Sequence, residues 1–141
     1  MPVRSASAIW NGGLKDGKGS FRTETGLTAN YSFTSRFGEG GASNPEELLA
    51  AAEAACFSMA LSGALEKSGA KDTKISSAAK CTVEKVGEGF TITSIALEVR
   101  VIAPGLDDAT LQRLAEDTRK NCPVSRALTG TKIEVKAVLA Q

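Results

Sequence analysis

The sequence contains no histidine among its 141 residues. This absence excludes Ser-His-Asp and Cys-His catalysis, because both use an imidazole as the general base. It also excludes the usual zinc and non-haem iron sites, which are built with histidine ligands. If the protein is an enzyme, its nucleophile and its acid–base groups must come from cysteine, lysine, arginine, tyrosine or the carboxylates.

Cysteine is scarce as well, with three in the whole chain: Cys56, Cys81 and Cys122. They are far apart and lack the C-x-x-C spacing that is typical of paired metal ligands. An all-cysteine metal centre is therefore not expected. The sequence predicts no metal site.

The chain also lacks an excess of charge of either sign, with 17 basic and 16 acidic residues. This balance argues against nucleic acid or an anionic membrane surface as the main partner. The most apolar stretch is interrupted by Glu53 and begins well inside the chain, so we expect no membrane span. The segment Met1 to Trp10 shows no signal-peptide pattern, so a cytoplasmic location is the default expectation. The length suits a single domain over residues 1–141.

One long helix dominates what is present. Ser43 or Asn44 can cap it, Pro45 suits its first position, and Gly69 is a plausible end. Apolar residues fall on almost every side of this helix: Leu48, Leu49, Ala50, Ala51, Ala52, Ala54, Ala55, Phe57, Met59, Ala60 and Leu61. A helix that is apolar all round is normally buried all round. One sheet covers only one side, so we expect a homodimer in which a second copy covers the rest.

The remaining segments predict strands at residues 3–10, 27–33, 71–86, 90–102 and 131–139, with an edge strand or loop at 15–24. The alternation slips near Ser94, which suggests either a bulge or a change in which face of the strand is covered. Asp107 or Asp108 can cap a second helix with an apolar stripe at Leu111 and Leu114. Residues 34–42 are glycine-rich and predict a flexible loop. The order of elements indicates an α+β fold that begins with an antiparallel meander.

Cys56 lies in the middle of the long helix, among small residues. It is either a packing residue or a reactive thiol, and a reactive thiol needs a nearby cation to form the thiolate. Arg36, in the loop before the helix, is the candidate cation, although it could equally be a solvated loop residue. Glu46 precedes Cys56 by almost three helical turns. It cannot reach the thiol along the helix, but it could hold an arginine that does.

Cys122 occurs in Asn-Cys-Pro-Val-Ser, where the proline marks the start of a helical turn. A helix N-terminus and the nearby Arg119, Lys120 and Arg126 all lower a thiol pKa, although a capping or packing role is the alternative. Cys81 falls on the apolar face of a strand and is expected in the core. Two potentially reactive thiols without histidine or metal suggest redox chemistry in which one thiolate attacks and the other resolves the product.

The motifs Asn44-Pro45-Glu46-Glu47-Leu48-Leu49-Ala50-Ala51, Ala54-Ala55-Cys56-Phe57 and Asn121-Cys122-Pro123-Val124-Ser125 resemble those of the OsmC/Ohr family. This family contains osmotically induced and organic-hydroperoxide-resistance proteins. The resemblance covers nearly the whole chain and is greater to the OsmC branch. After Gly12-Gly13 the Ohr pattern has an arginine, whereas this chain has Leu14. The OsmC branch takes its arginine from the loop before the helix, which matches Arg36.

The resemblance implies an OsmC/Ohr-like fold, with antiparallel sheets around a long buried central helix, in an intertwined homodimer. It implies a thiol peroxidase for organic hydroperoxides in stress defence, without a bound cofactor. By position, Cys56 is the peroxidatic cysteine and Cys122 the resolving cysteine, and the two form a disulfide. Arg36 stabilises the thiolate and Glu46 orients Arg36, with Glu47 as a rival for that role. The family's usual reductant is a lipoylated protein, which is the implied dithiol partner.

Two other readings of the sequence remain open. A non-catalytic binding domain would share the fold but keep Cys56 and Cys122 inert. A redox sensor would use their disulfide to change a partner interface. Thiol reactivity separates the first from a peroxidase, and an oxidation-dependent change of shape identifies the second.

Overall fold

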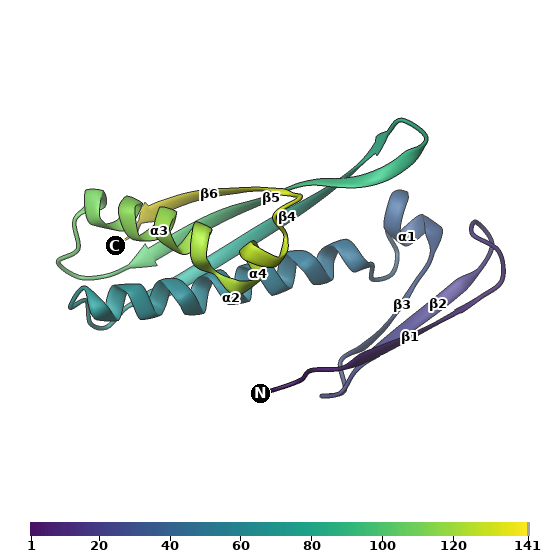
Figure 1. Cartoon of the computed structure of the whole chain (residues 1–141), viewed down its shortest axis with the longest axis horizontal. Helices are drawn as coiled ribbons and strands as arrows, with labels where there is room; N and C mark the ends of the chain where they lie inside the picture. The colour runs from purple at the N-terminus through teal and green to yellow at the C-terminus, as the bar shows by residue number, and fades with distance from the viewer. Residues whose placement is uncertain (141) are drawn as a thin grey trace. The chain divides into compact units, whose positions relative to one another are not determined.

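The computed structural model describes residues 1–140, and the chain forms two compact units, Met1–Leu48 and Leu49–Gln141. Figure 1 shows the course of the chain. The elements are β1 (Ala6–Asn11), β2 (Lys18–Thr23), β3 (Thr28–Tyr31), α1 (Phe33–Phe37), α2 (Pro45–Lys67), β4 (Lys74–Val86), β5 (Gly89–Ile102), α3 (Asp108–Asn121), α4 (Pro123–Ala127) and β6 (Lys132–Leu139). The α+β class is confirmed. The expectation of a single domain stays a prediction.

The first unit carries the expected antiparallel meander, in the order β1-β2-β3. The segment expected to be an edge strand or loop contains β2, which is the central strand of this sheet. Trp10 and Tyr31 flank β2 with ring centroids 5.4 Å apart. A Cβ at Gly19 would lie 2.6 Å from the Tyr31 ring and 2.7 Å from the Trp10 ring, so glycine is needed for these aromatic rings to close over the strand.

The prediction of a flexible loop at residues 34–42 is partly wrong, because α1 forms over Phe33–Phe37. Ser32 and Ser35 cap it reciprocally. The Ser32 side chain accepts a hydrogen bond from the Ser35 backbone N–H, and the Ser35 hydroxyl accepts one from the Ser32 N–H. This is a capping box with serine at a position where glutamate or glutamine is usual, so the sequence signal was weak. The short helix gives Arg36 a defined place.

The second unit holds a sheet in the order β4-β5-β6. β4 and β5 form an antiparallel hairpin, whereas β6 runs parallel to β5 after the crossover through α3 and α4. The sheets are therefore not all antiparallel, contrary to that detail of the expectation. The predicted irregularity near Ser94 is present, since Thr82 pairs with Ser94 while Val83 pairs with Ile92. One residue of β5 is left over, as in a bulge.

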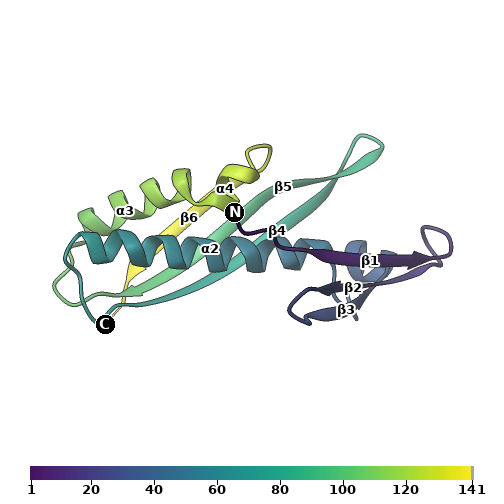
Figure 2. The same cartoon turned by 60° about the horizontal axis from the view of Figure 1, so that its bottom comes forward.

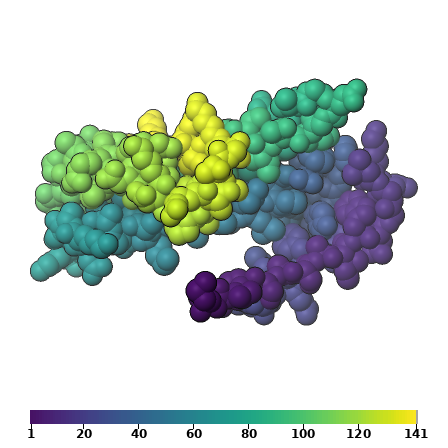
Figure 3. Space-filling model, in the orientation of Figure 1, coloured from purple at the N-terminus to yellow at the C-terminus, as the bar shows by residue number. Residues whose placement is uncertain are grey.

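The core of the second unit lies between one face of the sheet and the helices α2 and α3, which run along it in Figure 2. Alternate residues of β5 are buried, namely Ile95, Leu97, Val99 and Val101, and the last three belong to this core. The predicted stripe of α3 is confirmed, because Leu111 and Leu114 are buried, and Asp107 is the N-cap. In the space-filling view the α3–α4 segment, coloured green to yellow, lies against α2 (Figure 3).

Only one side of α2 is buried within the chain. Glu53, Phe57, Leu61 and Leu65 recur every four residues and have no exposed surface, whereas Met59 is 77% exposed. The expectation that α2 is buried on all sides is therefore not met by a single chain. The segment Pro45–Lys67 is also long and apolar enough to cross a membrane by length and composition, which corrects the expectation of no such stretch. The core helix of a soluble protein meets the same criteria.

Candidate active site

The fold of the second unit brings Cys56 and Cys122 into contact. The Cys122 and Cys56 thiols are hydrogen-bonded to each other, with the two Sγ atoms 2.7 Å apart. Cys56 is half-buried in the middle of α2, and Cys122 is 1% exposed. Sequence alone predicted both residues as candidates but could not place them together without the family resemblance, because 66 positions separate them.

Cys122 is placed by the break between α3 and α4. Its backbone N–H ends α3 by donating to the Thr118 carbonyl, and its own carbonyl accepts the first bond of α4 from Arg126. Pro123 follows at the first position of α4. A residue before proline is pushed out of the helical region, and Cys122 accordingly has φ −55° and ψ 128°. The chain turns at this point, where the Cys122 side chain meets α2.

The pKa of the Cys56 thiol is raised by its surroundings in this unit. Burial is the main cause, followed by the hydrogen bond with Cys122, which favours the protonated thiol, and the charges of Cys122 and Glu53 raise the pKa further. The Val124 backbone N–H acts in the opposite direction. Since a mid-helix site gains little from the helix dipole, a thiolate at Cys56 requires a positive charge from outside this set of groups.

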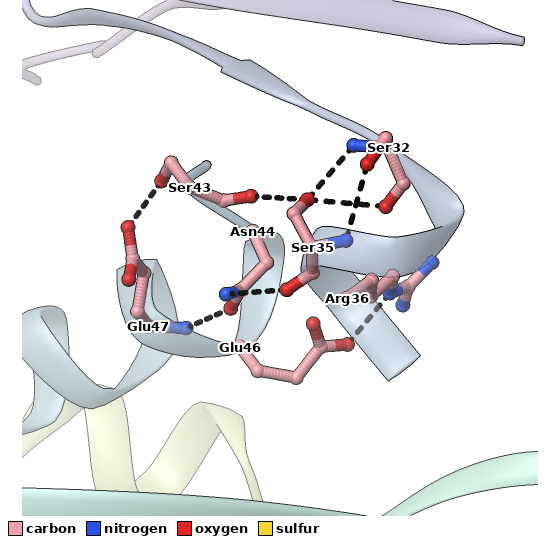
Figure 4. A network of polar contacts seen from close by, with 7 residues as sticks. All are labelled: Ser32, Ser35, Arg36, Ser43, Asn44, Glu46 and Glu47. Carbon is pink, nitrogen blue, oxygen red and sulfur yellow. Dashed lines mark hydrogen bonds and ion pairs between the residues drawn. The ribbon is translucent and has the colours of Figure 1, made fainter. Parts of the chain in front are cut away.

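The predicted contact between an arginine and a carboxylate is present in the first unit (Figure 4). Arg36 Nε donates to Glu46 Oε1 over 2.8 Å, and the side chains are 38% and 6% exposed, respectively. Glu47 instead accepts a hydrogen bond from the Ser43 hydroxyl and is exposed. Glu46, and not its rival Glu47, is therefore the carboxylate on Arg36. The guanidinium also lies over the Phe37 ring, with Cζ 4.9 Å from the centroid.

A hydrogen-bonded frame fixes α1 to the start of α2. The Ser35 hydroxyl donates to the Ser43 carbonyl over 2.7 Å, and Asn44 Nδ2 donates to the Ser35 carbonyl over 3.1 Å. Asn44 Oδ1 accepts from the Glu47 backbone N–H over 2.8 Å, so Asn44 caps α2 as one of the two expected residues. This frame, drawn in Figure 4, holds Arg36 and Glu46 in register.

A cavity of about 240 Å³ opens beside Arg36 within the first unit. Its lining is mostly aromatic: Trp10, Leu14, Tyr31, Ser32, Phe33, Arg36 and Phe37. An apolar cavity with one convergent cation suits a ligand with a carbon body and a polar or anionic end. Sequence analysis did not find this cavity, because its lining comes from β1, β3 and α1 and their flanks.

The polar pair that sequence analysis missed is Glu53 with Ser125. Glu53 was noted only as an interruption of the apolar helix, yet it is fully buried and accepts a hydrogen bond from the Ser125 hydroxyl. The available signal was its position three residues before Cys56, with Ser125 three residues after Cys122. Cys81 lies half-buried in β4, on the expected face of the strand but not within the hydrophobic core.

Replacing Cys122 with alanine removes the hydrogen bond and the charge by which Cys122 raises the Cys56 pKa, so the pKa of Cys56 should fall. We expect the pH midpoint for iodoacetamide alkylation of Cys56, followed by peptide mass spectrometry, to be lower in Cys122→Ala than in the wild type. Cys81→Ala is the control and should leave the midpoint unchanged. A midpoint that stays or rises in Cys122→Ala would contradict the role of this contact.

Comparison with known proteins places this site in a family. A family model described as OsmC-like protein matches residues 38–137. The chain is 44% identical over 128 residues to peroxiredoxin OsmC of Escherichia coli, covering 89% of each chain. It is 35% identical over 106 residues to an organic hydroperoxide resistance protein of Xanthomonas axonopodis pv. citri, covering 72% of this chain and 69% of the relative.

The fold agrees with the sequence comparison. The crystal structure of an organic hydroperoxide resistance protein OsmC from Legionella pneumophila is 25% identical, with a TM-score of 0.66 and complete coverage of both chains. Cys56, Cys122 and Glu46 all lie inside the segment that the family model matches. The chain therefore belongs to the OsmC-like protein family.

Proposed function

We propose that the protein is a cysteine-based peroxidase that reduces organic hydroperoxides to alcohols. The observation that carries this proposal is the contact between the Cys56 and Cys122 thiols, which lie 2.7 Å apart with Cys122 buried and Cys56 half-buried. Two adjacent thiols in a chain without histidine suit a cycle of sulfenic acid and disulfide. Relatives that carry peroxidase-type names support the same chemistry.

In the first step, the Cys56 thiolate attacks the terminal oxygen of the hydroperoxide. The O–O bond breaks, the alcohol leaves with a proton, and Cys56 becomes a sulfenic acid. Because the groups around Cys56 in its own unit raise its pKa, the proposal assigns the required cation to Arg36. Glu46 holds the guanidinium through Nε, so the terminal nitrogens remain available for a thiolate or a peroxide oxygen.

In the second step, the Cys122 sulfur attacks the oxidised Cys56 sulfur. The S–O bond breaks, and hydroxide leaves as water with the proton of the Cys122 thiol. The resulting disulfide needs an external dithiol to return both residues to thiols. We propose a lipoylated protein as that dithiol, as the family resemblance implies, and no bound cofactor.

The preference for organic substrates follows from the cavity beside Arg36. Its aromatic lining favours the carbon body of an alkyl or aryl hydroperoxide, whereas hydrogen peroxide gains nothing from apolar contacts. Arg36 at the cavity wall would face the polar peroxide end. We therefore propose that the first unit selects the substrate and that Cys56 performs the chemistry.

A second copy of the chain is the proposed cover for the exposed side of α2. Ala51, Ala52, Ala55 and Met59 are exposed there and form an apolar surface on a helix that otherwise meets the criteria for a membrane span. A homodimer removes this surface from water and makes the helix a core element of a soluble protein. We propose a soluble homodimer on this basis.

Single-turnover assays test the proposed peroxidase. Reduced protein should consume cumene hydroperoxide rapidly and hydrogen peroxide more slowly, and Cys56→Ser should consume neither. Loss of the Arg36 cation in Arg36→Met should slow the reaction by about 10²-fold or more, as removal of an electrostatic stabiliser does. No consumption by folded, fully reduced protein would overturn the proposal and leave a non-catalytic binding domain.

Sedimentation tests the proposed dimer. The wild type should sediment at micromolar concentration with twice the mass of the 14.6 kDa chain. Met59→Asp places a charge on the exposed apolar side of α2 and should shift the equilibrium toward monomer. Val86→Asp also charges an exposed apolar residue, but on β4, and should not. A monodisperse wild-type monomer would refute the dimer.

A further inference from the structure

A second contact joins α2 to α4 beside the thiol pair. The Ser125 hydroxyl donates to Glu53 Oε1, and both residues are buried, with exposed fractions of 7% and 0%. Glu53 lies three residues before Cys56 on α2, and Ser125 lies three residues after Cys122 on α4. The Cys56–Cys122 and Glu53–Ser125 contacts therefore lie next to each other, one helical turn apart, between α2 and an α4 segment that runs in the opposite direction.

Glu53 is an energetically unfavourable residue at this buried position. The other fully buried residues on the same stripe of α2 are Phe57, Leu61 and Leu65, all apolar. Glu53 Oε2 is buried without a hydrogen-bond partner among residues 1–140. Burying a carboxyl with an unsatisfied oxygen costs free energy, and a well-packed apolar side chain is often as stable or more stable there. Stabilisation of this buried side of α2 therefore does not explain why residue 53 is a glutamate.

The helix that carries the other half of the contact is short. α4 spans Pro123–Ala127, and a helix of five residues is not stable by its own hydrogen bonds. The position of Cys122 at its N-cap therefore depends on what α4 contacts. Ser125 is the buried residue of α4, and its side chain is the one that reaches Glu53.

We propose that Glu53 is a positioning residue for the resolving step, which rests on the proposed function. Oxidation of Cys56 to sulfenic acid removes the thiol–thiol contact that joins the helices, but it leaves the contact between Glu53 and Ser125 intact. This contact then keeps α4 in place, so that Cys122 can attack the Cys56 sulfur and release water before a second peroxide oxidises Cys56 further. The peroxide-consuming step does not need it.

Three variants separate this role from general stabilisation. Glu53→Leu removes the hydrogen-bond acceptor but fills the site with an apolar side chain, so the fold should persist. Glu53→Gln removes the charge but keeps an acceptor for the Ser125 hydroxyl, so the rate at which its disulfide forms should match that of the wild type. Ser58→Ala is the matched control, because Ser58 joins α2 to β4 through Ser77 over 2.7 Å without touching α4.

The first readout follows the fate of Cys56 after one equivalent of cumene hydroperoxide. In Glu53→Leu we expect disulfide formation to be about tenfold slower, since a hydrogen bond to a carboxylate is lost, while peroxide consumption in the first turnover is not slowed. Sulfenic acid, trapped with dimedone, should accumulate, and excess peroxide should give sulfinic acid. Resolution as fast as in the wild type would overturn the proposal.

The second readout does not depend on peroxide. The disulfide is formed with diamide and equilibrated against dithiothreitol, and its fraction is measured by peptide mass spectrometry. The effective concentration of Cys122 toward Cys56 should fall about tenfold in Glu53→Leu and not in Glu53→Gln or Ser58→Ala. An unchanged equilibrium refutes the positioning role. If the effective concentration falls in Glu53→Leu but the protein consumes no peroxide, the positioning role of Glu53 stands and only the proposed peroxidase activity is rejected.

Discussion

The contact between Cys56 and Cys122 is the constraint on which the rest of the site depends. It requires the middle of α2 to lie against the turn between α3 and α4, and several features of the second unit produce that arrangement. The crossover through α3 returns the chain to the same face of the sheet, where Leu111 and Leu114 share a core with α2. Pro123 then stops α3, turns the chain and leaves Cys122 at the point of contact.

The proposed mechanism assigns its chemical tasks to two groups of residues, the Cys56 thiol and the Arg36–Glu46 ion pair. Around Cys56, burial and neighbouring groups raise the thiol pKa, which favours the protonated form in the resting protein. The ion pair of Arg36 with Glu46 is prepared separately, on a frame that joins α1 to the first turn of α2. In the proposed mechanism, Cys56 becomes reactive when Arg36 and the Cys56 thiol act on the same peroxide molecule. Without substrate the thiol stays protonated, which limits its unproductive oxidation.

Local patterns predicted much of this structure, whereas contacts between distant segments were less accessible. Pro45, Gly69 and Asp107 marked helix boundaries correctly, because caps and breakers act over a few residues. The parallel pairing of β6 and the partner of Glu53 were not predicted, since both depend on how separate elements pack. α1 was missed because its capping box uses Ser35 in place of a longer polar residue. The candidate residues came from two thiol motifs together with the absence of histidine, and their pairing came only from the family resemblance.

The central claim is that Cys56 and Cys122 act as one redox pair, and the most direct measurement is the covalent product of a single oxidation. Reduced protein is treated with one equivalent of cumene hydroperoxide and digested without reductant, and its peptides are identified by mass spectrometry. The account predicts one cross-link between the peptides of Cys56 and Cys122 for each peroxide consumed, with Cys81 unmodified. Consumption of peroxide without this cross-link, or a cross-link through Cys81, would contradict it.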